Sequence, residues 1–144
     1  MTEEKTKYTT ARHGLKETFK FHGFTFPSTT PVPDQIFDEL LPLLSGAELK
    51  VLLYITRRTF GFKKESDRIS LSQITSGITK ANGDPLDYGT GLNEWTVLKA
   101  LKSLRSMNII VAHRNYSPNS GDQPTSYALN LAGTSLTSVY PHKR

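Results

Sequence analysis

The sequence predicts an α+β fold that is mainly α, a winged helix-turn-helix with three to four helices and a β-hairpin wing. Helix start signals and amphipathic spacing at residues 70–75 and 93–105 predict the two helices of a helix-turn-helix. The apolar run at 109–114, a polar stretch and a second strand-like run at 126–131 predict a hairpin directly after them. The order helix, helix, hairpin is that of a winged helix.

Length and composition are those of one globular domain with flanking segments. The chain has 144 residues, of which 36% are hydrophobic and 22% are charged, so it supports one core but hardly two. We divide it into an arm at 1–30, a winged-helix domain at 31–131 with an insertion at 77–91, and a tail at 132–144. We expect the arm to dock in part on the domain, because it contains Phe19, Phe21, Phe24 and Phe26.

The charge balance favours a polyanionic partner. The net charge is +5, and clustered cations gain affinity by displacing counterions from phosphates. The chain has no Cys, which excludes disulfides, a thiol nucleophile and cysteine-bound zinc. It has no apolar run of ~20 residues and no apolar h-region at its start, so we expect a cytoplasmic protein without a membrane partner.

The first predicted helix begins at Asp34, whose carboxylate can accept hydrogen bonds from the free amides of the first turn, and runs to about Leu44. Its apolar residues form one broad stripe for burial, namely Ile36, Phe37, Leu40, Leu41 and Leu44.

The second predicted helix begins with a capping box, in which Ser45 and Glu48 satisfy each other's backbone amides, and ends near Gly61. Its expected buried face consists of Leu49, Leu52, Leu53 and Phe60, with Ile55 and Thr56 beside them.

A basic segment begins in the last turn of this helix. Arg57 and Arg58 lie in its last turn, where the helix dipole favours cations, but they also lie just ahead of the predicted helix-turn-helix, a motif that commonly binds DNA. A structural and a phosphate-contacting role are both open for them. Lys63, Lys64 and Arg68 continue the basic segment.

A short third helix is predicted from a second capping box, Ser70 to Gln73. A minimal helix-turn-helix joins its helices by ~3 to 4 residues, whereas here residues 77–91 intervene. Asn82-Gly83 and Asp84-Pro85 favour turns, so we expect a small hairpin or a compact loop. This insertion is either an inert connection or an addition to a DNA-facing edge, to which it would contribute Lys80 and Tyr88.

The fourth predicted helix is the candidate recognition helix. Asn93 is a good N-cap, and the spacing of Val97, Leu101 and Leu104 predicts one buried side. The opposite side is the candidate DNA-contacting surface. The candidate DNA-binding residues are Trp95, Thr96, Lys99, Lys102, Ser103 and Ser106 on this helix, with Arg57, Arg58, Lys63, Lys64 and Arg114 toward phosphates.

Two residues at the start of this helix have alternative roles. Trp95 is either covered by the insertion or the core, or it contacts a thymine methyl group or a sugar. Glu94 would repel phosphates, so a capping or other structural role is favoured for it. The predicted wing has a long polar loop, Asn115 to Thr125, with Arg114 as its strong cation, so we expect the helix to dominate binding.

Motifs for catalysis or cofactor binding are missing. No phosphate-binding glycine motif and no nucleophile elbow occurs, and the histidines have no metal-ligand spacing. We therefore expect a protein that is not an enzyme and that binds no cofactor or metal.

Four stretches carry a resemblance to a known family, namely Thr30–Leu41, Ser45–Phe62, Asp67–Ile74 and Gly89–Leu101. They resemble the N-terminal domain of bacteriophage replication protein O and related phage or plasmid replication initiators, over roughly residues 30 to 115. The resemblance implies a winged-helix domain that binds origin DNA, often as a dimer, with a separate C-terminal region that recruits the replicative helicase. Glu94 and Trp95 stand where such proteins often carry small polar or basic residues.

The resulting expectation is sequence-specific binding of double-stranded DNA, with origin recognition in phage or plasmid replication. A homodimer and a replication-protein partner are the associations that the resemblance implies. The chain is then either a fragment of an initiator or a short relative that binds DNA without loading a helicase. Two other functions stay open: a winged-helix transcriptional regulator, and a protein–protein interaction module that has lost DNA binding.

Overall fold

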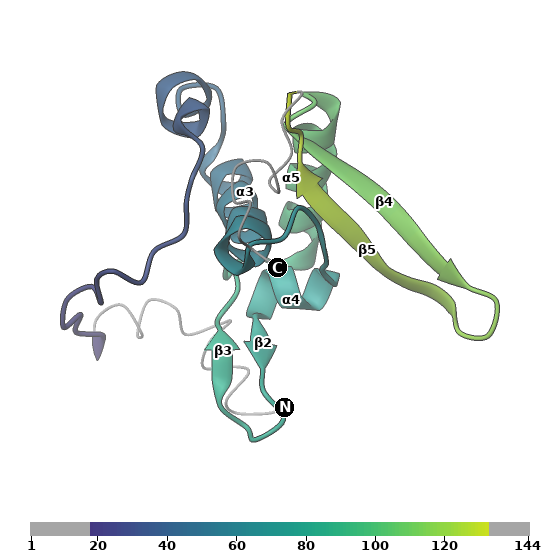
Figure 1. The fold of residues 1–144 in the computed structure, drawn as a ribbon, viewed down its shortest axis with the longest axis horizontal. Helices are drawn as coiled ribbons and strands as arrows, with labels where there is room; N and C mark the ends of the chain where they lie inside the picture. The colour runs from purple at the N-terminus through teal and green to yellow at the C-terminus, as the bar shows by residue number, and fades with distance from the viewer. Residues whose placement is uncertain (1–17, 133–144) are drawn as a thin grey trace.

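The computed structural model describes residues 18–132, so most of the predicted arm and nearly all of the predicted tail lie outside the described part. Its α+β class agrees with the sequence prediction: helices pack on antiparallel strands (Figure 1). In chain order the elements are η1 (Ile36–Leu40), α3 (Gly46–Thr59), η2 (Phe60–Phe62), β1 (Asp67–Arg68), α4 (Leu71–Ser76), β2 (Ile78–Thr79), β3 (Pro85–Asp87), α5 (Glu94–Ser106), β4 (Ile110–Ser117) and β5 (Gly121–Leu129).

The strands form two separate antiparallel sheets within the described residues. In one, the order is β1-β5-β4, and β1 pairs with β5 through Asp67 opposite Tyr127 and Arg68 opposite Ser126. The other is the β2–β3 hairpin of the insertion. Figure 1 shows both hairpins projecting from the helical body, β4–β5 to the right and β2–β3 downward.

The core lies between α3, α5 and the inner ends of the strands. On α5, Val97, Leu101 and Leu104 are buried as their spacing predicts, and Ala100 joins them. Residues from η1, α3, η2, α4, β4, β5 and the link after β1 complete the core, namely Ile36, Val51, Leu52, Tyr54, Ile55, Phe60, Ile69, Ile74, Ile110 and Leu129.

The capping box at the start of α3 is confirmed. The Ser45 amide donates to Oε1 of Glu48 at 2.8 Å, and the Glu48 amide donates to Oγ of Ser45 at 3.1 Å. The buried face is rotated from the predicted one, because Leu53 is 38% exposed while Val51 and Ile55 are fully buried. Two buried threonine hydroxyls bond to backbone carbonyls one turn earlier in the helix, as polar groups inside a core must.

The end of α3 differs from the prediction at Gly61. The α-helix ends at Thr59 and continues as the tighter turn η2, and the left-handed residue that stops it is Lys63, with φ 58°. The Lys63 amide donates to the Phe60 carbonyl at 3.0 Å, and the Lys64 amide donates to the Thr59 carbonyl at 2.9 Å. Lys63 therefore holds a conformation that a lysine adopts only with such support.

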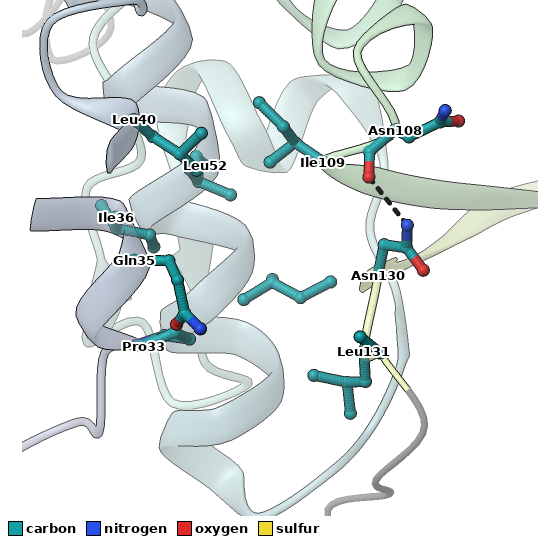
Figure 2. Close-up of a pocket in the computed structure, with 11 residues that line it drawn as sticks. Pro33, Gln35, Ile36, Leu40, Leu52, Asn108, Ile109, Asn130 and Leu131 are labelled. Carbon is teal, nitrogen blue, oxygen red and sulfur yellow. Dashed lines mark hydrogen bonds between the residues drawn. The ribbon is translucent and has the colours of Figure 1, made fainter. Parts of the chain in front are cut away.

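The predicted helix from Asp34 to Leu44 is replaced in part by a π-helical turn. The Leu41 amide donates to the Ile36 carbonyl at 3.0 Å, an i to i+5 bond that widens the turn. Ile36 is buried, but Phe37 and Leu41 are 54% and 43% exposed, so the predicted five-residue stripe is wrong at these two positions. An apolar cleft of ≈ 300 Å³ lies between Ile36 and Leu40 on this side and the end of β5 on the other. Figure 2 shows the residues that line it.

The insertion forms the hairpin that its turn residues predict. Lys80 donates its amide to the Asp84 carbonyl at 2.7 Å, and Gly83, with φ 94°, closes the turn by donating to the Lys80 carbonyl at 2.9 Å. At the base of the hairpin the two chain segments cross at Gly77 and Gly89. A Cβ on Gly77 would lie 2.1 Å from the Asp87 carbonyl oxygen, so only glycine permits this approach.

The base of the insertion is tied to α3. The Tyr54 hydroxyl lies 3.1 Å from Oδ1 of Asp87, and Nζ of Lys50 lies 3.3 Å from the Thr90 carbonyl oxygen. The amide and hydroxyl of Thr90 also donate to the Ile74 carbonyl at 2.8 and 2.7 Å. The long connection between α4 and α5 is therefore a fixed structure at its base.

The predicted polar loop from Asn115 to Thr125 is wrong. β4 and β5 continue through this stretch as paired strands, and the turn between them is residues 118–120. The register shifts between His113 and Asn115, opposite Pro124, which has no amide to donate and is tolerated at such a bulge.

The described part of the arm does not dock through its phenylalanines. Phe19, Phe21, Phe24 and Phe26 are between 58% and 92% exposed, contrary to the expectation that their apolar character would bring them onto the domain.

Candidate nucleic-acid interface

Within residues 18–132, no segment covers the outward side of α5. The Asn93 side chain accepts a hydrogen bond from the Thr96 amide at 2.8 Å and starts the helix as predicted. From there, one turn after another, the exposed residues of this side are Trp95, Lys99, Lys102 and Ser106. Among the described residues neither lysine takes part in an ion pair.

Trp95 is not covered by the insertion or the core, so that interpretation of the tryptophan is wrong. Its side chain is 67% exposed, and Nζ of Lys99 lies 4.2 Å above its ring centre. A cation over an indole face is attracted by the ring's negative face, which holds the lysine on the outward side of α5. The pair places a flat apolar surface and a positive charge next to each other.

Thr96 and Ser103 lie at the flank of this surface, half-buried, and not at its centre. With Lys99 they line one wall of a cleft of ≈ 420 Å³, and the start of α3, including Ser45 and Glu48, forms the other wall. A hydrogen bond from Ser103 is the main reason why the pKa of Glu48 lies below its ordinary value, with the Ser45 amide as the second cause. Ser103 is thus engaged with α3.

We expect Ser103→Ala to raise the pKa of Glu48 toward its ordinary value of 4.5, because the main hydrogen bond to the carboxylate is lost. A lowered pKa stabilises the fold above the ordinary value, and that stabilisation disappears as the pH falls through the lowered pKa. The variant should therefore be less stable than the parent at neutral pH and equally stable in acid. Carboxyl NMR titration and thermal unfolding measure both effects; Ser106→Ala, one turn away and exposed, should change neither.

Arg58 is a structural residue, which decides between its two predicted roles. It is 7% exposed, and its Nη2 lies 2.8 Å from Oδ2 of Asp67. The same guanidinium donates to the Tyr54 hydroxyl at 3.3 Å, to Oε1 of Gln73 at 3.2 Å and to the Arg68 carbonyl at 3.2 Å. With its donors directed to these partners, we leave Arg58 out of the proposed interface.

The other cations of this basic segment, Arg57 in the last turn of α3 and Lys63 and Lys64 after it, are exposed but not all unpaired. Arg57 lies 4.6 Å above the Phe62 ring and donates to the Gly61 carbonyl at 3.4 Å. Nζ of Lys64 lies 3.3 Å from Oδ1 of Asp67, while Lys63 extends from its left-handed position. These exposed contacts are weak enough for a phosphate to replace them.

Arg114 on the β4–β5 hairpin is paired with Asp122. Their side chains are 2.8 Å apart and 79% and 65% exposed, so the pair contributes little to stability and is strongly solvated. Arg114 is the one Lys or Arg of β4 and β5, and its charge is locally balanced.

Sequence reasoning did not identify the network around Tyr54. Burial is the main cause that raises the pKa of Tyr54 to about 12, and the nearby Asp87 carboxylate adds to it. The hydroxyl therefore stays protonated and joins the Arg58 side of α3 to the insertion. The spacing of Tyr54 and Arg58, four residues apart on one helix, was the available indication.

Two properties hold across residues 18–132. No helix there has both the length and the apolar character that a membrane span requires. In the same range, His, Asp and Glu side chains form no group of three or more that could hold a metal ion.

A comparison with family models identifies the family of the chain. The model of bacteriophage replication protein O matches residues 29–121, more than half of the 144 residues, from the segment before η1 to the start of β5. Comparisons with curated proteins and with solved structures find no significant match. The chain therefore belongs to the bacteriophage replication protein O family.

Proposed function

We propose that this domain is a winged-helix module that binds double-stranded DNA, with α5 as the recognition helix, and that it recognises an origin in phage or plasmid replication. The observation that carries the proposal is the uncovered outward side of α5, on which Lys99 and Lys102 are exposed beside Trp95. Membership of the replication protein O family supports the replication role over a role in transcription. The proposed role is binding without catalysis, in the cytoplasm.

The topology supports the winged-helix assignment. The order α3, β1, α4, α5, β4, β5, with β1 pairing to the outer side of β5, is a three-helix unit closed by a small sheet whose hairpin projects as a wing. Such a unit presents its last helix to the major groove, which is wide enough to admit an α-helix. The insertion lengthens the connection between α4 and α5 but leaves the outward side of α5 open.

The charges on α5 suit the proposed partner. Lys99 and Lys102 lie about one turn apart, so both can reach the phosphates or base edges that border one groove. Arg57 in the last turn of α3 and Lys63 and Lys64 after η2 are further exposed cations for phosphate contacts, and Arg114 adds one on the wing. Trp95 offers an apolar face for a thymine methyl group or a sugar.

We expect Lys99→Ala combined with Lys102→Ala to weaken binding to a mixed-sequence duplex by about tenfold or more at physiological salt, since two phosphate or base contacts are lost. The slope of log affinity against log salt should also become shallower, by about one unit for each lysine that contacts a phosphate. Fluorescence anisotropy over a salt series measures both quantities. The matched control is Lys99→Arg with Lys102→Arg, which keeps the charges and should keep duplex binding.

Unchanged duplex affinity in the double alanine variant would rule out α5 as the recognition helix. A parent protein that binds no duplex would instead favour an interaction module, in which Trp95 holds a protein partner. Selection of bound sequences from a random duplex pool then identifies the target, and repeated or palindromic winners would indicate a dimer.

A further inference from the structure

The stretch from Phe19 to Phe26, here called the aromatic segment, presents four rings that the domain does not bury. Phe19, Phe21, Phe24 and Phe26 are 68%, 58%, 92% and 84% exposed. Phenylalanine rings are large apolar groups, so four that are exposed close together form an apolar patch of the kind that marks a contact surface. Figure 1 shows this purple part of the chain to the left of the helical body, away from α5 and from the β4–β5 hairpin.

Three of the rings form one cluster on a backbone without helix or strand from Phe19 to Phe24. The ring centres of Phe19 and Phe21 are 6.4 Å apart with planes 29° from parallel, and Phe24 meets Phe21 edge-on at 4.8 Å. Because Phe24 is 92% exposed, its outer face is open to a flat partner. The cluster is thus a small platform of aromatic faces.

The charges of the same segment indicate that its partner is negatively charged. Lys20 and His22 alternate with the phenylalanines, and no Asp or Glu occurs from residue 18 to residue 33. Lys20 is exposed, so its charge is available to a partner. An aromatic platform that carries a cation, and no acidic residue between Phe19 and Phe26, suits a polyanion that also has flat apolar faces.

We infer that the aromatic segment is a second nucleic-acid site and that it takes single-stranded DNA, by stacking bases on Phe19, Phe21 and Phe24. Stacking on aromatic side chains together with a cation that follows the backbone is how single strands are bound without sequence preference. A duplex gains little from such a platform, because its base faces already stack on one another. The inference goes beyond duplex recognition by α5 and does not depend on it.

The test uses the full 144-residue chain and an oligothymidine of about 16 nucleotides, with binding followed by anisotropy. The triple variant Phe19→Ala, Phe21→Ala and Phe24→Ala should lose about tenfold or more in affinity for this strand, since each stacked base typically contributes at least fivefold. The three sites are exposed, so far-UV circular dichroism should be unchanged. Phe37→Ala, which removes an exposed ring from η1, is the matched control and should leave strand binding within about twofold of the parent.

Two further triple variants separate stacking from general apolar contact. Leucine at the three sites keeps apolar bulk without a ring and should lose as much affinity as alanine, whereas tyrosine keeps the rings and should retain binding. All three triple variants should keep duplex affinity, and the Lys99→Ala and Lys102→Ala variant should keep strand binding, so that this inference and the duplex proposal can fail separately. A parent that does not bind the strand, or a leucine variant that binds as well as the parent, would overturn the inference. Loss of self-association in the alanine variant with unchanged strand binding would also overturn it and identify a protein contact.

Discussion

Arg58→Ala is expected to lower the free energy of unfolding by about 3 kcal/mol, the largest effect of any single side-chain truncation proposed for this domain. The change removes a buried guanidinium that contacts Asp67, Tyr54 and Gln73, and it leaves the Asp67 carboxylate, whose side chain is 18% exposed, without its main partner. An uncompensated charge in a mostly buried place costs more than the pair contributes. Urea unfolding followed by circular dichroism measures the loss.

The adjacent residue is the matched control for this prediction. Arg57 carries the same side chain on the same helix turn but is exposed, so Arg57→Ala should cost only about 0.5 kcal/mol. Because Arg58 and Asp67 interact directly, Arg58→Ala combined with Asp67→Ala should cost clearly less than the sum of the two single changes. Additive losses, or equal losses for Arg57→Ala and Arg58→Ala, would show that the network does not stabilise the fold.

Gly77→Ala is expected to destabilise the domain by about 3 kcal/mol, from two causes that add. Gly77 has φ 89°, a backbone conformation that side chains rarely adopt, and an added Cβ would meet the Asp87 carbonyl oxygen at 2.1 Å. The crossing with the segment at Gly89 would have to open, and the insertion would lose its attachment to α3. Urea unfolding gives the loss of stability, and hydrogen exchange at residues 78–87 reports the opening.

Gly83→Ala separates the two causes. Gly83 has φ 94°, but nothing lies within 4 Å of an added Cβ, so only the backbone strain applies and the loss should be about 1 kcal/mol. If the two alanine variants lost the same stability, the close approach at Gly77 would have no structural role.

Features that depend on neighbouring residues could be predicted from the sequence. The buried side of α5 follows from the spacing of Val97, Leu101 and Leu104, because a helix with one buried side shows a period of 3.6 residues. The capping boxes at Ser45 and Ser70 are confirmed because both partners of each box lie within four residues.

Features that depend on residues far apart in the sequence could not be predicted from it. The contacts of Arg58 come from β1 and α4 as well as from α3, so the sequence left a dipole role and a phosphate role equally open. Residues 115–125 are polar on both faces and show no alternation, yet they form strands because the backbone hydrogen bonds of β4 and β5 hold them in register. The exposure of Trp95 depends on the direction in which the insertion leaves the body, which no local pattern encodes.

The crossing at Gly77 and Gly89 fixes the base of the insertion, whereas the tip of its hairpin contributes no residue to the core. Relatives could therefore lengthen or shorten the tip around Asn82 without disturbing the angle between α4 and α5. Because the base of the hairpin is fixed to the domain, a dye attached at the tip would report the orientation of the domain. Energy transfer from such a dye to a labelled oligonucleotide would map how the domain is oriented on its target.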